Sequence, residues 1–184
     1  MKAKHCLLAI IALAAIALAI MLWPKTQAPS GGQDATQVST TTSLPVIRTF
    51  IDNGGAVETK NGKPVIRMYS TTSCPHCKWV KGAYEEVANE YVNKSLIIAY
   101  HWELDIDLDV MRQEAVDVPK SEKDIFIKFN PRRTVPTFVF ASKYYRIGNG
   151  YESKGDLEAE KAEFRAVIER LIEESRGNIP LNGS

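Results

Sequence analysis

The spacing of apolar residues changes from that of a strand to that of a helix across the sequence CPHC at residues 74–77. Apolar residues between 65 and 69 predict a buried strand that runs into this motif. After Pro75, apolar side chains recur at helical spacing to about residue 93. Proline suits the first helical turn, because no backbone N–H is needed there. The sequence therefore predicts a strand, a tight loop with two cysteines, and a helix.

The rest of the chain alternates strand and helix signals. The pair Asn61-Gly62 predicts a hairpin within residues 56–70, since both residues tolerate positive φ. Further strands are predicted at 95–104, 137–142 and 144–148, short helices at 109–116 and 121–129, and a long amphipathic helix at 155–174. This order predicts an α/β fold, in which a mixed sheet is flanked by helices on both faces.

The N-terminal segment is far more apolar than the rest. Lys2 and Lys4 precede an uninterrupted apolar run at residues 7–23. As a helix, this run reaches about 26 Å, compared with about 30 Å for the hydrocarbon core of a bilayer. We predict a transmembrane signal-anchor at residues 1–24, because the core of a signal peptide usually has only about 7–15 apolar residues. A cleaved signal peptide is the alternative.

The remaining segments follow from composition. Small and polar residues at 25–43 predict a flexible linker. The folded domain is expected at residues 44–176, with a short tail at 177–184. The N-terminal lysines predict a single-pass membrane protein whose N-terminus is cytoplasmic and whose domain is extracytoplasmic. A formal net charge of +1 gives no reason to expect a nucleic-acid partner.

The two cysteines of the CPHC motif carry the predicted chemistry. The nucleophile in disulfide exchange is a thiolate, and a helix N-terminus in a Cys-X-X-Cys unit lowers a thiol pKa from about 8.5 to about 3.5–7.5. Cys74 directly precedes the helix and is expected to attack, aided by a charge or hydrogen bond from His76. Cys77 is expected to resolve the mixed disulfide. No metal is expected, because zinc needs four ligands and the sequence has no second CxxC.

Three motifs, MYSTTSCPHC, RTVPTFVF and IGNGYESKGDL, occur in an order that resembles the thioredoxin superfamily. The resemblance covers residues from about 44 to 174 and implies a thioredoxin-like fold. It implies a cis peptide bond at Pro136 beside the cysteines, with Thr134 and Val135 binding the substrate peptide. It also implies that a redox-active Cys74–Cys77 disulfide serves in place of any added cofactor.

The resemblance extends to two branches of that superfamily. CPHC together with Val–Pro is similar to the DsbA-type disulfide oxidases, whereas Gly148-Asn149-Gly150 and Asp156 are similar to the glutathione site of glutaredoxins. Many thioredoxins have a buried acid six residues before the first cysteine, where this chain has Met68.

The function implied by this resemblance is that of an extracytoplasmic thiol–disulfide oxidoreductase. Its expected partners are cysteine-containing secreted or membrane proteins, and a membrane redox partner is expected to recharge its disulfide. A glutathione-dependent reductase and a thiol-based metal-binding module are the two alternatives.

Overall fold

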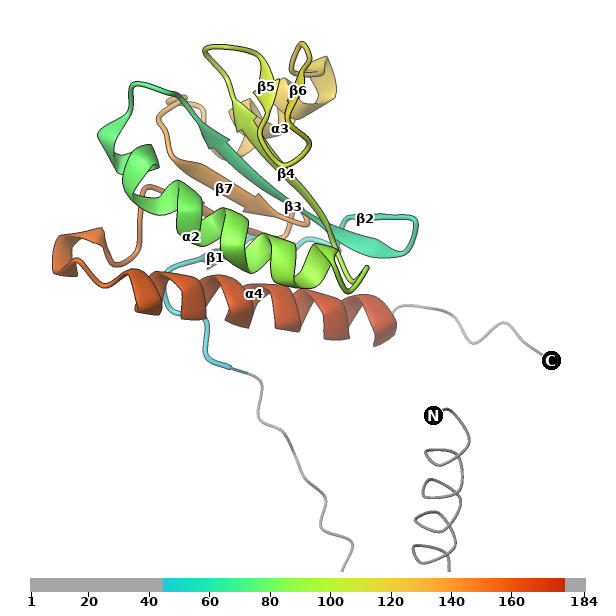
Figure 1. Ribbon diagram of the computed structural model, residues 1–184. Coiled ribbons are helices and arrows are strands. Elements are labelled where there is room, and N and C mark those ends of the chain that lie inside the picture. The colour runs from blue at the N-terminus through green and yellow to red at the C-terminus, as the bar shows by residue number, and fades with distance from the viewer. Residues whose placement is uncertain (1–44, 178–184) are drawn as a thin grey trace, which may run out of the picture. The chain divides into compact units, whose positions relative to one another are not determined.

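The computed structural model describes residues 45–177, which fold around one mixed β-sheet (Figure 1). The strands are β1 (Ile51–Asp52), β2 (Thr59–Lys60), β3 (Lys63–Ser70), β4 (Ile98–Glu103), β5 (Leu108–Asp109), β6 (Glu114–Ala115), β7 (Thr137–Phe140) and β8 (Tyr144–Ile147). The helices are α2 (Pro75–Val92), α3 (Lys120–Phe129), the 3-10 helix η1 (Glu152–Lys154) and α4 (Leu157–Gly177). The strand order is β1-β8-β7-β3-β4-β5-β6, and β2 pairs with β3 outside this path.

Strand β3 is the centre of the sheet. It pairs in parallel with β4 and antiparallel with β7, and its residues from Pro64 to Ser70 are all buried. A strand that is covered on both faces requires a nearly continuous apolar run, which is what the sequence has there. The hairpin that joins β2 to β3 turns at Asn61-Gly62, where φ is 54° and 72°. The predicted turn is therefore confirmed.

Helices α2 and α4 lie side by side across one face of the sheet, and α3 covers the opposite face (Figure 1). Ile66 and Met68 of β3 belong to the core under α2 and α4, whereas Tyr69 belongs to the core under α3. Aromatic rings fill the first core, with centroids 4.9–6.5 Å apart among Phe50, Phe138, Phe140 and Phe164. Burying each such side chain contributes about 1.5–3 kcal/mol, so Phe164 holds α4 on the sheet.

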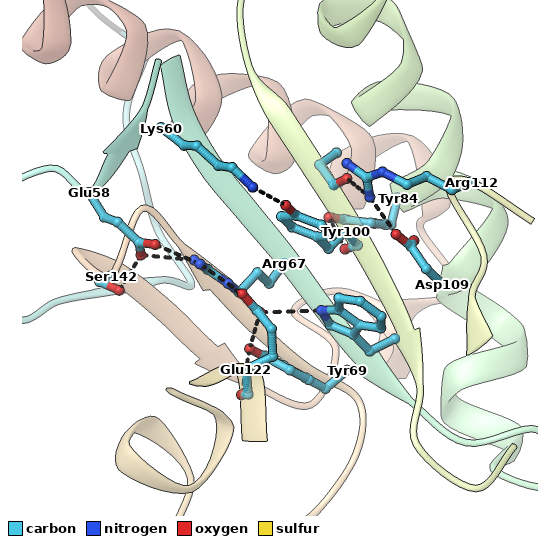
Figure 2. A network of polar contacts seen from close by, with 12 residues as sticks. Glu58, Lys60, Arg67, Tyr69, Tyr84, Tyr100, Asp109, Arg112, Glu122 and Ser142 are labelled. Carbon is cyan, nitrogen blue, oxygen red and sulfur yellow. Dashed lines mark hydrogen bonds and ion pairs between the residues drawn. The ribbon is translucent and has the colours of Figure 1, made fainter. Parts of the chain in front are cut away.

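The face under α3 contains a buried charged network around Arg67 (Figure 2). Arg67 donates from Nε to Glu122 at 2.6 Å, and from Nη1 and Nη2 to Glu58 at 2.8 and 2.6 Å. Glu122 also accepts from the Tyr69 hydroxyl and the Trp102 indole, each at 3.2 Å. Burial by itself lowers the pKa of Arg67, but bonds to the two carboxylates raise it above its ordinary value. The network thus joins α3 to the sheet through Glu122.

Residues 109–116 do not form the predicted helix. They form β5, a turn and β6, which pair antiparallel. The carboxylate of Asp109, 1 % exposed, accepts from the Met111 N–H at 3.1 Å and pairs with Arg112. An aspartate that bonds the backbone two residues on stabilises a turn and competes with a helix. The strands at β3, β4, β7 and β8 and the helices at α2, α3 and α4 confirm the other predicted elements.

The predicted fold class, a thioredoxin-like mixed sheet preceded by a transmembrane anchor, is wrong. Residues 45–177 form a mixed α/β structure with eight strands and three α-helices, and none of these helices is long and apolar enough to cross a membrane. The side of α2 that faces away from the sheet carries exposed charges such as Lys78 and Glu86, which hydrocarbon disfavours. The predicted anchor (1–24), linker (25–43) and tail after residue 177 lie outside the described residues.

Candidate functional site

Cys74 is the N-cap residue of α2, and Pro75 is the first residue of the helix. The backbone of Cys74 is extended, with φ −72° and ψ 117°, and its sulfur accepts a hydrogen bond from the Cys77 N–H at 3.3 Å. The first helical turn has N–H groups without intrahelical partners, and the helix dipole adds partial positive charge there. The half-buried sulfur of Cys74 therefore lies where negative charge is well stabilised.

Cys77 lies one turn further along α2 and is 1 % exposed. Burial is the main cause that raises the pKa of this thiol to about 12, and its hydrogen bond with Cys74 adds to the effect. Cys77 is thus protonated at neutral pH. Both cysteines are free thiols, so the predicted disulfide pair is wrong for this structure. The Cys77 backbone N–H donates to the Cys74 sulfur at 3.3 Å in its place.

The loop before β7 lies directly beside Cys74. Its Val135–Pro136 peptide bond is cis, as the resemblance implies. The Cys74 thiol lies 3.7 Å from the carbonyl oxygen of Val135, in a long S–H···O contact. Thr134 is exposed, and its carbonyl oxygen accepts from the Asn130 side-chain amide at 2.7 Å. Thr134 therefore braces the loop, while the Val135 carbonyl is the loop group in contact with the sulfur.

The hydrogen bonds of the His76 ring go to Glu152. The side chain is 63 % exposed, and Nδ1 lies 2.9 and 3.0 Å from the two carboxylate oxygens of Glu152. Asn149 donates from Nδ2 to the His76 carbonyl oxygen at 2.9 Å and to Glu152 at 2.8 Å. The bond from Asn149, supported by His76, lowers the pKa of Glu152. Within residues 45–177, no hydrogen bond links the His76 ring to Cys74 or Cys77.

A buried chain of hydrogen bonds runs beneath α2. The His101 ring is fully buried, with Nδ1 2.9 Å from the Glu85 carboxylate and Nε2 2.7 Å from the Ser70 hydroxyl. This serine–histidine–glutamate arrangement has the order of a hydrolytic triad. Ser70 is only 1 % exposed, however, so a substrate cannot reach its hydroxyl. The chain couples α2 to the end of β3 and is structural.

Glu103 places an acid near the buried cysteine. It ends β4, is 7 % exposed and lies 3.8 Å from the amine of Lys81. Its charge is a minor contributor to the raised pKa of Cys77, after burial and the bond to Cys74. Met68, where many thioredoxins have their acid, is instead part of the apolar core. Glu103, on the neighbouring strand β4, is thus an acid whose charge acts on Cys77.

The region that resembles a glutathione site uses its polar groups internally. The Gly150 N–H donates to Glu160 at 3.0 Å, and Glu160 is fully buried. Asp156 accepts from the Ala159 N–H at 2.9 Å and so caps the start of α4. The Gly150 N–H is therefore already bonded within the protein, whereas Asp156 is exposed and combines its capping role with an accessible carboxylate.

The surroundings of the site include a cavity but, among the described residues, no set of metal ligands. A cavity of about 450 Å³ borders the loop that contacts Cys74, and its lining includes Phe129, Thr134, Tyr145 and Ile147. In the part of the chain that the structure describes, no cluster of three or more His, Cys, Asp or Glu side chains is arranged to hold a metal ion.

The structure brings together most residues that the sequence singled out and adds others. Cys74, Cys77 and the Val135–Pro136 bond meet at the start of α2. Sequence reasoning missed Glu152, which lies 76 positions from His76 and was given no role although it falls within the IGNGYESKGDL motif. It also missed Glu103, which is buried near Cys77. Only the fold brings these two carboxylates to the dithiol.

No protein-family model and no curated protein matches this chain. Among solved structures, one that is similar is the crystal structure of a protein from Agrobacterium tumefaciens, at 14 % sequence identity and a TM-score of 0.37. The match covers 67 % of this chain and 50 % of that chain, so this chain spans about half the length of that protein. A likeness this weak supports no conclusion about function.

Proposed function

We propose that this protein is a thiol–disulfide oxidoreductase, with Cys74 as the nucleophile and Cys77 as the resolving thiol. One observation carries the proposal. The Cys74 sulfur caps α2 and lies 3.7 Å from the carbonyl of Val135, with a second, buried thiol one helical turn away. A helix N-terminus favours the thiolate that exchange needs.

The reaction transfers two electrons in two steps. The Cys74 thiolate attacks one sulfur of a substrate disulfide, forms a mixed disulfide and releases the other substrate sulfur as a thiolate. Cys77 then loses its proton and attacks the Cys74 sulfur. A Cys74–Cys77 bond forms, and the second substrate sulfur leaves as a thiol. The protein is oxidised and the substrate reduced; reversal of both steps oxidises a substrate dithiol.

The high pKa of Cys77 separates the roles of the two thiols. Burial and the bond to Cys74 raise that pKa to about 12, so Cys77 holds its proton while Cys74 is free to react. Formation of the mixed disulfide at Cys74 removes that hydrogen-bond partner and its charge. Both changes make Cys77 easier to deprotonate. Its thiol can therefore attack the Cys74 sulfur once the mixed disulfide has formed.

A protein cysteine fits this site better than glutathione does. The amide of Gly150 and the carboxylate of Asp156, which resemble part of a glutathione site, are engaged by Glu160 and by α4. The Val135 carbonyl beside Cys74 can instead accept from the backbone of an extended peptide. Secreted or membrane proteins as substrates, a recharging membrane partner and an extracytoplasmic location stay predictions from the sequence.

The proposal is tested by measuring insulin reduction and oxidation of reduced ribonuclease side by side. We expect the full chain to catalyse at least one of these reactions, and Cys74→Ser to lower the rate to background, because the attacking sulfur is gone. Cys6→Ser is the matched control and should keep the wild-type rate. Absence of both activities in the wild-type chain, or full activity in Cys74→Ser, would contradict the proposal. Activity only toward a glutathione mixed disulfide would favour the reductase alternative.

A further inference from the structure

The segment from Gly148 to Glu152 touches the CPHC motif through His76. Asn149 donates to the His76 carbonyl oxygen at 2.9 Å, and the Glu152 carboxylate lies 2.9 Å from the ring Nδ1. In Figure 1 this segment, between β8 and α4, lies next to the start of α2. The backbone carbonyl and the ring of His76 are thus both hydrogen-bonded by residues outside the CPHC motif.

The segment that makes these contacts is itself held in place by a buried carboxylate. The buried carboxylate of Glu160 accepts from the Gly150 and Tyr151 N–H groups at 3.0 and 2.9 Å. Glu160 also pairs with the buried guanidinium of Arg146. A methyl group added at Gly150 would lie 2.8 Å from an Arg146 nitrogen, so the backbone is closely packed there. Asn149 and Glu152 are therefore set in place by the core.

We propose that Glu152 is a positioning residue that holds the His76 ring away from the Cys74 thiolate and thereby makes the dithiol a weaker oxidant. The inference rests on the proposed function and adds a residue that influences whether the dithiol oxidises or reduces its substrate. Its basis is the paired contact of Nδ1 with both oxygens of Glu152, at a distance typical of a charge-assisted hydrogen bond.

The physical reason is competition for one imidazole. A cation or N–H donor near the thiolate stabilises the reduced form of the pair, and a stabilised reduced form makes the pair a stronger oxidant. When the ring donates to Glu152, that donor is withdrawn from Cys74, and the carboxylate offsets the charge of a protonated ring. A CPHC motif restrained in this way is a milder oxidant than its histidine alone predicts.

The test is the equilibrium constant of the dithiol with glutathione, measured on the full chain in wild type, Glu152→Gln, His76→Ala and the double variant. Exposed ion pairs are weak, so we expect Glu152→Gln to shift the equilibrium toward the reduced protein by about three- to fivefold, which is about 14–21 mV. In the His76→Ala background the same change should have a smaller effect. Glu173→Gln, an exposed site at the other end of α4, is the matched control and should have no effect.

A second readout does not depend on exchange activity. The rate of Cys74 alkylation by iodoacetamide at pH 7, followed by peptide mapping, should rise in Glu152→Gln and not in the double variant. An equal change in both His76 backgrounds, no change, or a shift toward the oxidised protein would overturn the role of Glu152. A wild-type chain without exchange activity would contradict the proposed function, while the alkylation rates would still decide the role of Glu152.

Discussion

Two polar clusters in this protein differ in how completely their groups are bonded. In the network under α3, the Glu122 carboxylate accepts from Arg67, Tyr69 and Trp102 (Figure 2). At the start of α2, the Cys74 sulfur has a contact of 3.3 Å to an N–H and one of 3.7 Å to a carbonyl, and it is half exposed. A saturated cluster is suited to holding the fold together, whereas an unsaturated and accessible one is suited to chemistry.

The difference between the two cysteines gives the largest predicted effect. A thiol that titrates at about pH 12, as burial makes Cys77 do, holds about 10³-fold less thiolate at pH 7 than an ordinary free thiol. We therefore expect iodoacetamide to label Cys74 at least about 10³ times faster than Cys77, as measured by peptide mapping. Labelling of Cys77 should increase about tenfold per pH unit up to about pH 12, since the thiolate is the reactive form. Equal rates at pH 7 would remove the distinction between the two thiols.

Glu122→Ala tests whether the network under α3 is structural. Removing this carboxylate leaves the buried guanidinium of Arg67 short of a partner, which typically costs about 3–5 kcal/mol. We expect a loss of that size in the free energy of unfolding measured with urea, with exchange activity per folded molecule unchanged. Glu122→Gln keeps the shape and should lose less. A loss below about 1 kcal/mol would show that the network does not stabilise the fold.

Ser70→Ala tests the buried chain beneath α2. The variant leaves Nε2 of His101 without its partner at 2.7 Å, and an unsatisfied buried group costs about 1–3 kcal/mol. The free energy of unfolding should fall by this amount, while Ser73→Ala, at an exposed position, should change it by less than about 0.5 kcal/mol. Equal effects of the two substitutions would argue against the bond to His101.

The smallest effect is expected at an exposed ion pair. Lys120 and Asp124 lie 2.6 Å apart on α3, yet their side chains are 87 % and 57 % exposed. Pairs of this kind contribute about 0.2–1 kcal/mol. Lys120→Ala should therefore lower the free energy of unfolding by less than about 1 kcal/mol, and by less still at 1 M salt. A loss as large as that of Glu122→Ala would show that burial does not distinguish the two ion pairs.

Local sequence patterns predicted those elements whose conformation is set by residues close together in the sequence. The apolar run of β3, the Asn61-Gly62 turn and the start of α2 at Pro75 all follow from nearby residues. The cis bond at Pro136 follows from the resemblance alone. The helix predicted at 109–116 failed because the burial of Asp109, which fixes the turn, depends on the sheet edge.

The candidate site divides in the same way. The CPHC motif identified both thiols, but the bond from His76 to Glu152 and the position of Glu103 near Cys77 depend on how distant segments pack. The free state of the two thiols also could not be read from the motif, because one spacing serves both redox forms. The spacing of the cysteines indicates which residues react. The charged side chains that influence their reactivity are brought near them only when the chain folds.

The most direct test of the account is to trap the mixed disulfide. Cys77→Ser is incubated with a peptide disulfide, and the products are separated without reductant and mapped by mass spectrometry. We predict a covalent adduct at Cys74 that persists, because no second thiol resolves it, and that does not accumulate in the wild-type chain. An adduct absent from Cys74, or one that accumulates equally in both proteins, would contradict the division of roles between the two cysteines.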